Sequence, residues 1–183
     1  MSEENLVRQC APTLAGIKTG TIFPVPFDSL PGLTAEIRDL NRILVPKGLR
    51  LLPLRYQGRK ALLYLYRPAG LKRDLQDRLA AALLAEAGYP KKGSEQCVAH
   101  LARRFRSGEG FPHEVGLFLS YPPQDVSGFI ENRAVNYKCA GLWKVYGDVE
   151  QAQRLFARYR KCTDIYCELW RAGSGIGQLA VAV

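Results

Sequence analysis

His113 and Glu114 are neighbouring residues of the two types that most often act as general acids and bases. They follow Ser107–Pro112, which contains two glycines and a proline and is predicted to be a loop, a common location for site residues. Adjacent side chains of a strand point to opposite faces, so only one of the pair would reach a given site. Either residue is therefore a candidate catalytic group, and the alternative is a structural role for both.

Cys10 is the candidate catalytic thiol. It stands beside Ala11-Pro12, just before the first predicted strand, and we expect it to be exposed. A nucleophilic cysteine needs a lowered pKa, and Lys18 is the nearest lysine in the sequence. Cys97 and Cys139 fall on predicted core faces, where cysteine packs as a small hydrophobe. Because the chain has no CxxC pair, the cysteine spacing predicts no metal site.

Aromatic and basic side chains alternate around Trp143, Lys144 and Tyr146. Such a pattern can stack on a base or a flat cofactor while neutralising its acidic groups. A half-buried strand with an exposed lysine face gives the same pattern, and both interpretations stay open. With Lys18 and Tyr121, these three residues form the predicted ligand-binding set, for which the sequence identifies no particular cofactor.

The chain is strongly basic, with 26 Lys and Arg against 17 Asp and Glu and a formal net charge of +9. A surplus of this size attracts polyanions. Arg103, Arg104 and Arg106 are expected on the outward face of a helix and are the candidate nucleic-acid-binding residues. The same positive surface would suit an acidic protein partner. The other clusters of Lys and Arg are scattered over several predicted elements, which favours a simply solvated basic surface.

The first third of the chain predicts strands around one helix. Pro12–Val25 is rich in Thr, Ile, Val and Phe and predicts a strand. A helix follows and ends at Gly48, a residue suited to a left-handed stop. Leu49–Tyr56 and Lys60–Arg67 then predict a hairpin, in which Pro53 indicates a bulge or an edge position.

Helical spacing dominates the rest of the chain. Leucines at 71, 75, 79 and 83 predict one helix that stops at Gly88. The further predicted elements are a helix that begins at Ser94, a short strand or helical turns over His113–Tyr121, a helix after Pro122-Pro123, a strand over Tyr137–Tyr146, a helix from Asp148 to Gly173, and a final strand or frayed tail over Gln178–Val183.

These elements predict a mixed αβ protein of the α+β class, with a mostly antiparallel or mixed sheet and helices packed on it. We expect a single domain over residues 1–183, with 1–9 and 174–183 as flexible ends. No apolar run approaches the ~20 residues of a membrane span. The acidic, polar start is unlike a secretory signal, and the odd number of cysteines suits reduced thiols. We therefore expect a cytoplasmic protein without a membrane partner.

Several blocks of the sequence together resemble a known family. They are Cys10–Lys18, His113–Pro122, Asp125-Val126, Gly128–Ile130 and Trp143–Tyr146. This combination is similar to an uncharacterised bacterial family, domain of unknown function 3793, found in anaerobic Gram-positive bacteria. The resemblance spans nearly the whole chain and brings no established activity.

The resemblance implies a cytoplasmic single-domain protein. The association of such genes with flavodoxin and ferrous-iron uptake genes further implies a role linked to iron or redox metabolism. This chain departs from the family pattern at Ser120, where a glycine is expected, and at Pro123, where an aliphatic residue is usual. Any role that depends on the turn at Tyr121-Pro122 is sensitive to these two changes.

We expect Cys10–Lys18, His113–Tyr121 and Tyr137–Tyr146 to meet around one hollow, because their polar residues lie in otherwise apolar blocks and are costly to bury unused. The predicted function is the binding of an anionic or flat ligand, such as a tetrapyrrole, a flavin or a metal-linked group. If the protein is an enzyme, Lys18 and Lys144 would offset substrate charge. The alternatives are a nucleic-acid-binding accessory protein and a module that docks an acidic, flavodoxin-like redox protein.

Overall fold

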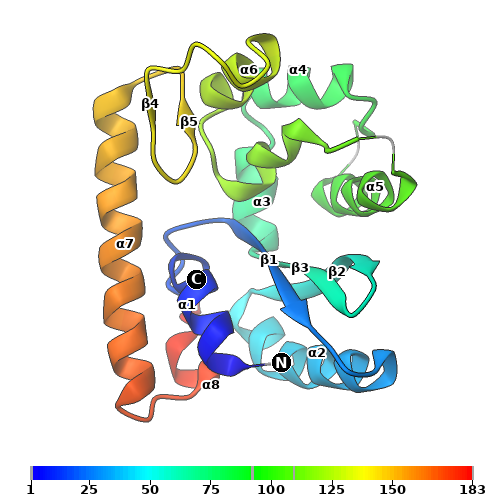
Figure 1. Ribbon diagram of the computed structural model, residues 1–183, viewed down its shortest axis with the longest axis vertical. Coiled ribbons are helices and arrows are strands. Elements are labelled where there is room, and N and C mark those ends of the chain that lie inside the picture. Colours follow the sequence, from blue (N-terminus) through cyan, green and yellow to red (C-terminus); the bar gives the residue numbers. More distant parts are fainter. Residues whose placement is uncertain (1, 92, 109, 183) are drawn as a thin grey trace.

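The fold is organised around a three-stranded antiparallel sheet (Figure 1). The computed structural model describes residues 2–91, 93–108 and 110–182. Strands β1 (Gly20–Pro26), β2 (Arg50–Gln57) and β3 (Lys60–Tyr66) lie in the order β1-β3-β2, and both pairs are antiparallel. The predicted α+β class with helices packed on an antiparallel sheet is confirmed.

The hairpin β2–β3 forms as predicted. Its register shifts between Pro53 and Arg55, which is the irregularity that the proline indicated. Proline has no amide hydrogen for the ladder and is tolerated here because β2 is an edge strand. Strand β3 is central, and its alternate side chains enter different cores: Leu63 and Leu65 on one face, Tyr64 and Tyr66 on the other.

Three helices cover the first face of the sheet, α1 (Glu3–Leu14), α2 (Leu30–Leu44) and α8 (Ile176–Leu179). The Ser29 hydroxyl caps α2 by accepting a hydrogen bond from the Gly32 amide, and the chain leaves through η1 (Val45–Lys47) and a left-handed Gly48. The helix predicted before Gly48 is therefore confirmed.

The secondary structure predicted near both ends of the chain is partly wrong. Residues 3–14 form α1, and its Leu6 and Val7 are fully buried, so a strand begins only at Gly20. Pro12 lies inside the last turn of α1, where it removes a single helical hydrogen bond, the one from its own position to the carbonyl of residue 8. Near the C-terminus, Ile176 opens α8 and is buried in the same core, in place of a strand or a frayed tail. Residues 1 and 183 lie outside the described residues.

Helices cover the second face of the sheet too: α3 (Pro68–Asp74), α4 (Arg78–Glu86), α5 (Ser94–Ser107), the 3₁₀ helix η2 (His113–Leu119) and α6 (Pro123–Glu131). The single helix predicted from the leucine ladder is wrong. The chain breaks at Asp77, whose carboxylate accepts hydrogen bonds from the amides of Leu79 and Ala80 and starts α4 afresh. Helical turns, rather than a strand, occupy 113–119.

The segment from Tyr137 to Tyr146 is a hairpin and not the single predicted strand. Its strands β4 (Cys139–Ala140) and β5 (Lys144–Val145) pair antiparallel around a short turn. Helix α7 (Val149–Arg171) follows and runs along one side of the molecule, beside α1 (Figure 1). The helix predicted from Asp148 is confirmed, and the Asp148 carboxylate caps it by accepting a hydrogen bond from the Gln151 amide. Among the described residues, no helix is both long and apolar enough to cross a bilayer.

Arg67 ties three distant parts of the chain together. Its buried guanidinium donates to the carbonyl oxygens of Thr13 and Leu14 at the end of α1, of Lys47 in η1, and of Val181 near the C-terminus, at 2.7–3.4 Å. A cation at a helix C-terminus is favourable because the last carbonyls have no partner within the helix. One side chain thus joins both ends of the described chain to the sheet.

Candidate functional site

Four of the residues predicted to bind ligand or catalyse line one pocket: His113, Tyr121, Trp143 and Lys144. The pocket has a volume of about 430 Å³ and lies between η2, α6 and the β4–β5 hairpin. Its walls are mainly apolar and are completed by Phe111, Val115, Gly116, Leu119, Asp125, Val126, Phe129, Ala140, Gly141 and Leu142. We call it the aromatic pocket.

Tyr121 and Trp143 form a stacked pair in the wall of the aromatic pocket. Their ring centroids are 4.7 Å apart and the ring planes differ by 27°. Phe156 of α7 meets the Trp143 indole edge-on at 4.5 Å, so the indole is fixed from two directions. Burial raises the pKa of the Tyr121 phenol, which therefore stays neutral. The pocket thus has a rigid, flat aromatic wall.

Asp125 positions this wall, although it is not among the site residues predicted from the sequence. One carboxylate oxygen accepts from the Trp143 indole N–H at 2.7 Å, and the other accepts from the amides of Tyr146 and Gly147. The side chain is buried, and these three donors satisfy its charge. Asp125 therefore links α6 to the hairpin and orients the indole.

The rim of the pocket carries two basic groups. The Lys144 amine donates to the Ala134 carbonyl oxygen at 2.7 Å and lies 4.8 Å from the centroid of the Tyr137 ring. His113 is exposed, with its ring 5.1 Å from that of Phe129. Tyr146 stands apart from the pocket lining, and its hydroxyl donates to the Val135 carbonyl oxygen.

Glu114 faces away from the aromatic pocket and holds helices together. Its carboxylate accepts from the Tyr89 hydroxyl at 2.8 Å and lies 3.4 Å from the Arg104 guanidinium. Burial, reinforced by the neighbouring carboxylate, raises the pKa of Tyr89, so this phenol remains a donor. The pairing joins η2 to α5 and to the chain after α4, which is a structural arrangement.

Cys10 is fully buried in the first core, and the expectation that it is exposed is wrong. Burial raises the pKa of its thiol, whereas a nucleophile requires a lowered one. Helix α1 takes Cys10 away from the aromatic pocket. Lys18, from the same sequence block, lies 5.7 Å from the Tyr121 ring centroid but lines a separate cavity. The three blocks therefore meet only in part.

Two of the three arginines of α5 lie on its outward face as expected. Arg103 and Arg106 are exposed, but Arg104 turns inward to Glu114 and donates to the Ala87 carbonyl oxygen. Arg106 donates to the carbonyl oxygen of Leu54 on the neighbouring strand. Two of the three guanidinium groups are thus already engaged within the fold.

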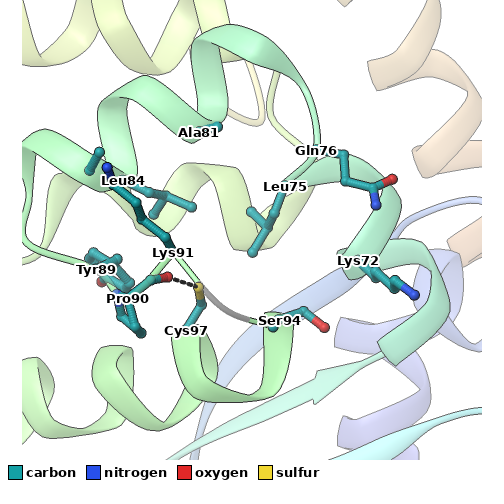
Figure 2. A pocket seen from close by; sticks show the side chains of 12 residues that line it. Lys72, Leu75, Gln76, Ala81, Leu84, Tyr89, Pro90, Lys91, Ser94 and Cys97 are labelled. Carbon is teal, nitrogen blue, oxygen red and sulfur yellow. Dashed lines mark hydrogen bonds between the residues drawn. The ribbon is translucent and has the colours of Figure 1, made fainter.

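Another cavity, of about 460 Å³, lies between α3, α4 and α5 (Figure 2). Leu75, Leu84 and Tyr89 contribute its apolar wall, and the Cys97 thiol donates to the Pro90 carbonyl oxygen across it. Burial raises the pKa of Cys97, so its thiol is not activated. Within the described ranges, no cluster of three or more His, Cys, Asp or Glu residues is arranged to hold a metal ion.

Comparison with known proteins gives one match. The family model described as "Protein of unknown function (DUF3793)" matches residues 6–180. The chain belongs to the DUF3793 family. No curated protein and no solved structure matches it.

Membership of the DUF3793 family bears on Ser120, where the family resemblance led us to expect a glycine. Ser120 has a φ of 59°, in the left-handed region that glycine adopts most easily. Its hydroxyl accepts from the Thr19 amide at 2.7 Å and reaches the Asp74 carboxylate at 3.4 Å. These local bonds explain how this DUF3793 member accommodates a serine in the turn before the stacked Tyr121.

Proposed function

We propose that the protein binds a flat aromatic ligand with at least one acidic group in the aromatic pocket. The observation that carries the proposal is the stacked Tyr121–Trp143 pair, fixed in the wall of an apolar cavity of about 430 Å³. Volumes of 300–1,000 Å³ are usual for small-molecule sites. A planar ring system gains most from such a wall because it can extend the stack.

The charges around the pocket support an acidic ligand. Lys144 and His113 stand at the rim, whereas both oxygens of Asp125 are already occupied by N–H donors. A carboxylate or phosphate on the ligand would therefore meet basic groups without displacing an internal ion pair. Flavins and tetrapyrroles combine a flat ring with acidic groups and are the first ligands to test.

The link to iron or redox metabolism in anaerobes is part of the same proposal and is supported by the family resemblance. Flavins and iron tetrapyrroles are redox-active, which makes the ligand class and the inferred role compatible. Catalysis is a weaker proposal, because Cys10 and Glu114 lie away from the pocket and His113 alone of the three predicted catalytic residues lines it.

Fluorescence titration tests the proposal. The chain has two tryptophans, so a Trp170→Phe background leaves Trp143 as the sole reporter. We expect flavin mononucleotide or protoporphyrin IX to quench Trp143 with saturation. Ala140→Phe should weaken binding at least tenfold because it fills the rim, while Ala157→Phe on exposed α7 should leave it unchanged. Absence of quenching by either compound, or equal binding by both variants, contradicts the proposal.

A second candidate function is docking of an acidic protein over the same rim. Phe111 and Leu142 are 62% and 44% exposed there, next to Lys144, and exposed apolar residues rimmed by charge are typical of interaction sites. Binding of a flavodoxin-like protein that Phe111→Ser weakens, without binding of free flavin, would favour this candidate. Nucleic-acid binding has less support because Arg104 and Arg106 are engaged internally.

A further inference from the structure

A third cavity, of about 580 Å³, lies where the end of α1, the start of α3 and the Ser120 turn come together. Its lining includes three basic side chains, Lys18, Arg67 and Arg73, and a single carboxylate, Asp74. The cavity is separate from the aromatic pocket, although Tyr121 has a place near both: it stacks on Trp143 and lies beside Lys18.

Lys18 is the most unusual group in this cavity. Its amine is half-buried between two aromatic rings, 5.7 Å from the centroid of Tyr121 and 6.0 Å from that of Tyr159. Among the described residues, no carboxylate oxygen lies within 4.0 Å of it. A charge inside a protein is normally paired, and aromatic faces compensate only part of the lost hydration.

The other charges of the cavity do not neutralise Lys18. Four of the N–H groups of Arg67 are taken by backbone carbonyls, and within the described ranges no carboxylate forms an ion pair with it. Asp74 accepts from the hydroxyls of Thr19 and Ser120, and its other oxygen lies 3.9 Å from Arg73. Three cations against one anion leave this cavity with a surplus of two positive charges.

We propose that this cavity binds a small oxyanion, either inorganic phosphate or the phosphate of a monoester, with the Lys18 amine as its main contact. An oxyanion would give Lys18 the partner that it lacks and would offset the charge of Arg67. Phosphate suits a site with several separate cations because its oxygens can accept from more than one donor at once. The site stands independently of ligand binding in the aromatic pocket.

Calorimetric titration tests the proposal with inorganic phosphate and, in a second arm, glycerol phosphate, each against chloride at matched ionic strength. Tighter binding of the ester identifies a phosphorylated metabolite as the ligand, and equal binding identifies phosphate itself. Lys18→Met should weaken binding at least tenfold. Lys161→Met, which removes the same charge from exposed α7, should change it less than twofold. Ala140→Phe should leave phosphate binding intact, which separates this site from the aromatic pocket.

The pH dependence of the unmodified protein gives a second test that requires no variant. Burial lowers the pKa of Lys18 to about 8, so phosphate affinity should fall at least fivefold between pH 7 and pH 9.5. Three other titratable groups also face Lys18, namely Cys10, Tyr121 and Tyr159. Burial raises the pKa of each, so these groups stay neutral over most of this pH range. Arg67, Arg73 and Asp74 line the same cavity. No preference for phosphate over chloride, full binding by folded Lys18→Met, or affinity independent of pH would overturn the proposal.

Discussion

The amine of Lys18 shows how a position in the fold changes the chemistry of one side chain. Burial lowers its pKa from 10.5 to about 8, because the folded protein solvates the ammonium ion less well than water does. Below pH 8 the group is protonated in both the folded and unfolded states, and the folded state carries the desolvation cost. Between pH 8 and 10.5 the unfolded state binds more protons, so this group's contribution to stability rises with pH.

Lys18→Met should therefore stabilise the protein at pH 7. The fall in the pKa from 10.5 to about 8 sets an upper limit of about 3.5 kcal/mol for this gain, at about 1.4 kcal/mol per pKa unit. The stability difference between the variant and the wild type should shrink as the pH rises from 8 to 10.5, because the folded wild-type protein releases the Lys18 proton and no longer buries a charge. Urea denaturation of both proteins across this range, in buffer without phosphate, measures the difference. A constant difference, or a destabilised variant at pH 7, would contradict the assigned environment of Lys18. Lys161→Met is the matched control and should show no trend.

Asp125 is the residue on which the geometry of the aromatic pocket depends. In Asp125→Asn, the side-chain amide cannot accept from all three donors, so the Trp143 indole N–H or the hairpin amides lose a partner. We expect a loss of about 1–3 kcal/mol in stability, the usual cost of a buried group left without its hydrogen bond. Urea denaturation monitored by Trp143 fluorescence measures it. Asp164→Asn on the exposed face of α7 is the control, and its free energy of unfolding should lie within about 0.5 kcal/mol of the wild-type value.

At the scale of elements, β1 approaches η2 so closely that only glycine fits at its first position. A Cβ at Gly20 would lie 2.4 Å from the Phe118 carbonyl oxygen, which also accepts a hydrogen bond from the Tyr64 hydroxyl. Gly20→Ala should therefore cost about 1–3 kcal/mol through overpacking. Gly175→Ala, where a Cβ meets nothing within 4 Å, should cost less than about 1 kcal/mol. Thermal denaturation of the pair checks the contrast, and equal effects would contradict it.

Elements with strong local signals could be predicted from the sequence. The helix between Ser29 and Gly48, the β2–β3 hairpin and α7 each combine a regular apolar spacing with end signals. Helix α1 could not be predicted, because Pro12 and the β-branched residues after it suggested a strand. Its buried face is set by packing against α7. The regular leucine spacing predicted one helix in place of α3 and α4 because the spacing continues across the break at Asp77.

The candidate site could be predicted only in part, for a related reason. His113, Tyr121, Trp143 and Lys144 share a pocket because η2 and the β4–β5 hairpin happen to pack together. The polar character that singled out Glu114 is used instead for contacts with Tyr89 and Arg104. A costly buried polar group signals that it has a partner, but the sequence does not say whether that partner is a ligand or the protein itself.

At the scale of the whole molecule, Arg67 holds together segments that are far apart in the sequence. Arg67→Met should remove the guanidinium donors from the carbonyl oxygens of Thr13, Leu14 and Val181, of which the first two keep only a backbone N–H donor, and cost about 3–5 kcal/mol. Arg67→Lys should recover only part of this, because an ammonium group lacks the planar spread of a guanidinium. Arg160→Met on exposed α7 is the charge-matched control. Denaturant unfolding measures the free energy of unfolding, which should fall from wild type to Arg67→Lys to Arg67→Met. An Arg67→Met protein as stable as the control would refute the role of Arg67.

The contact of α1 with α7 has a consequence for how the protein is made. The apolar face of α1 packs against a helix that is translated about 150 residues later, and Trp170 near the end of that helix completes the same core. Ribosomes add about 5–20 residues per second, so Leu6, Val7 and Leu14 are synthesised roughly 8 to 30 seconds before the helix that packs over them. During that interval the apolar face of α1 lacks its native contact with α7.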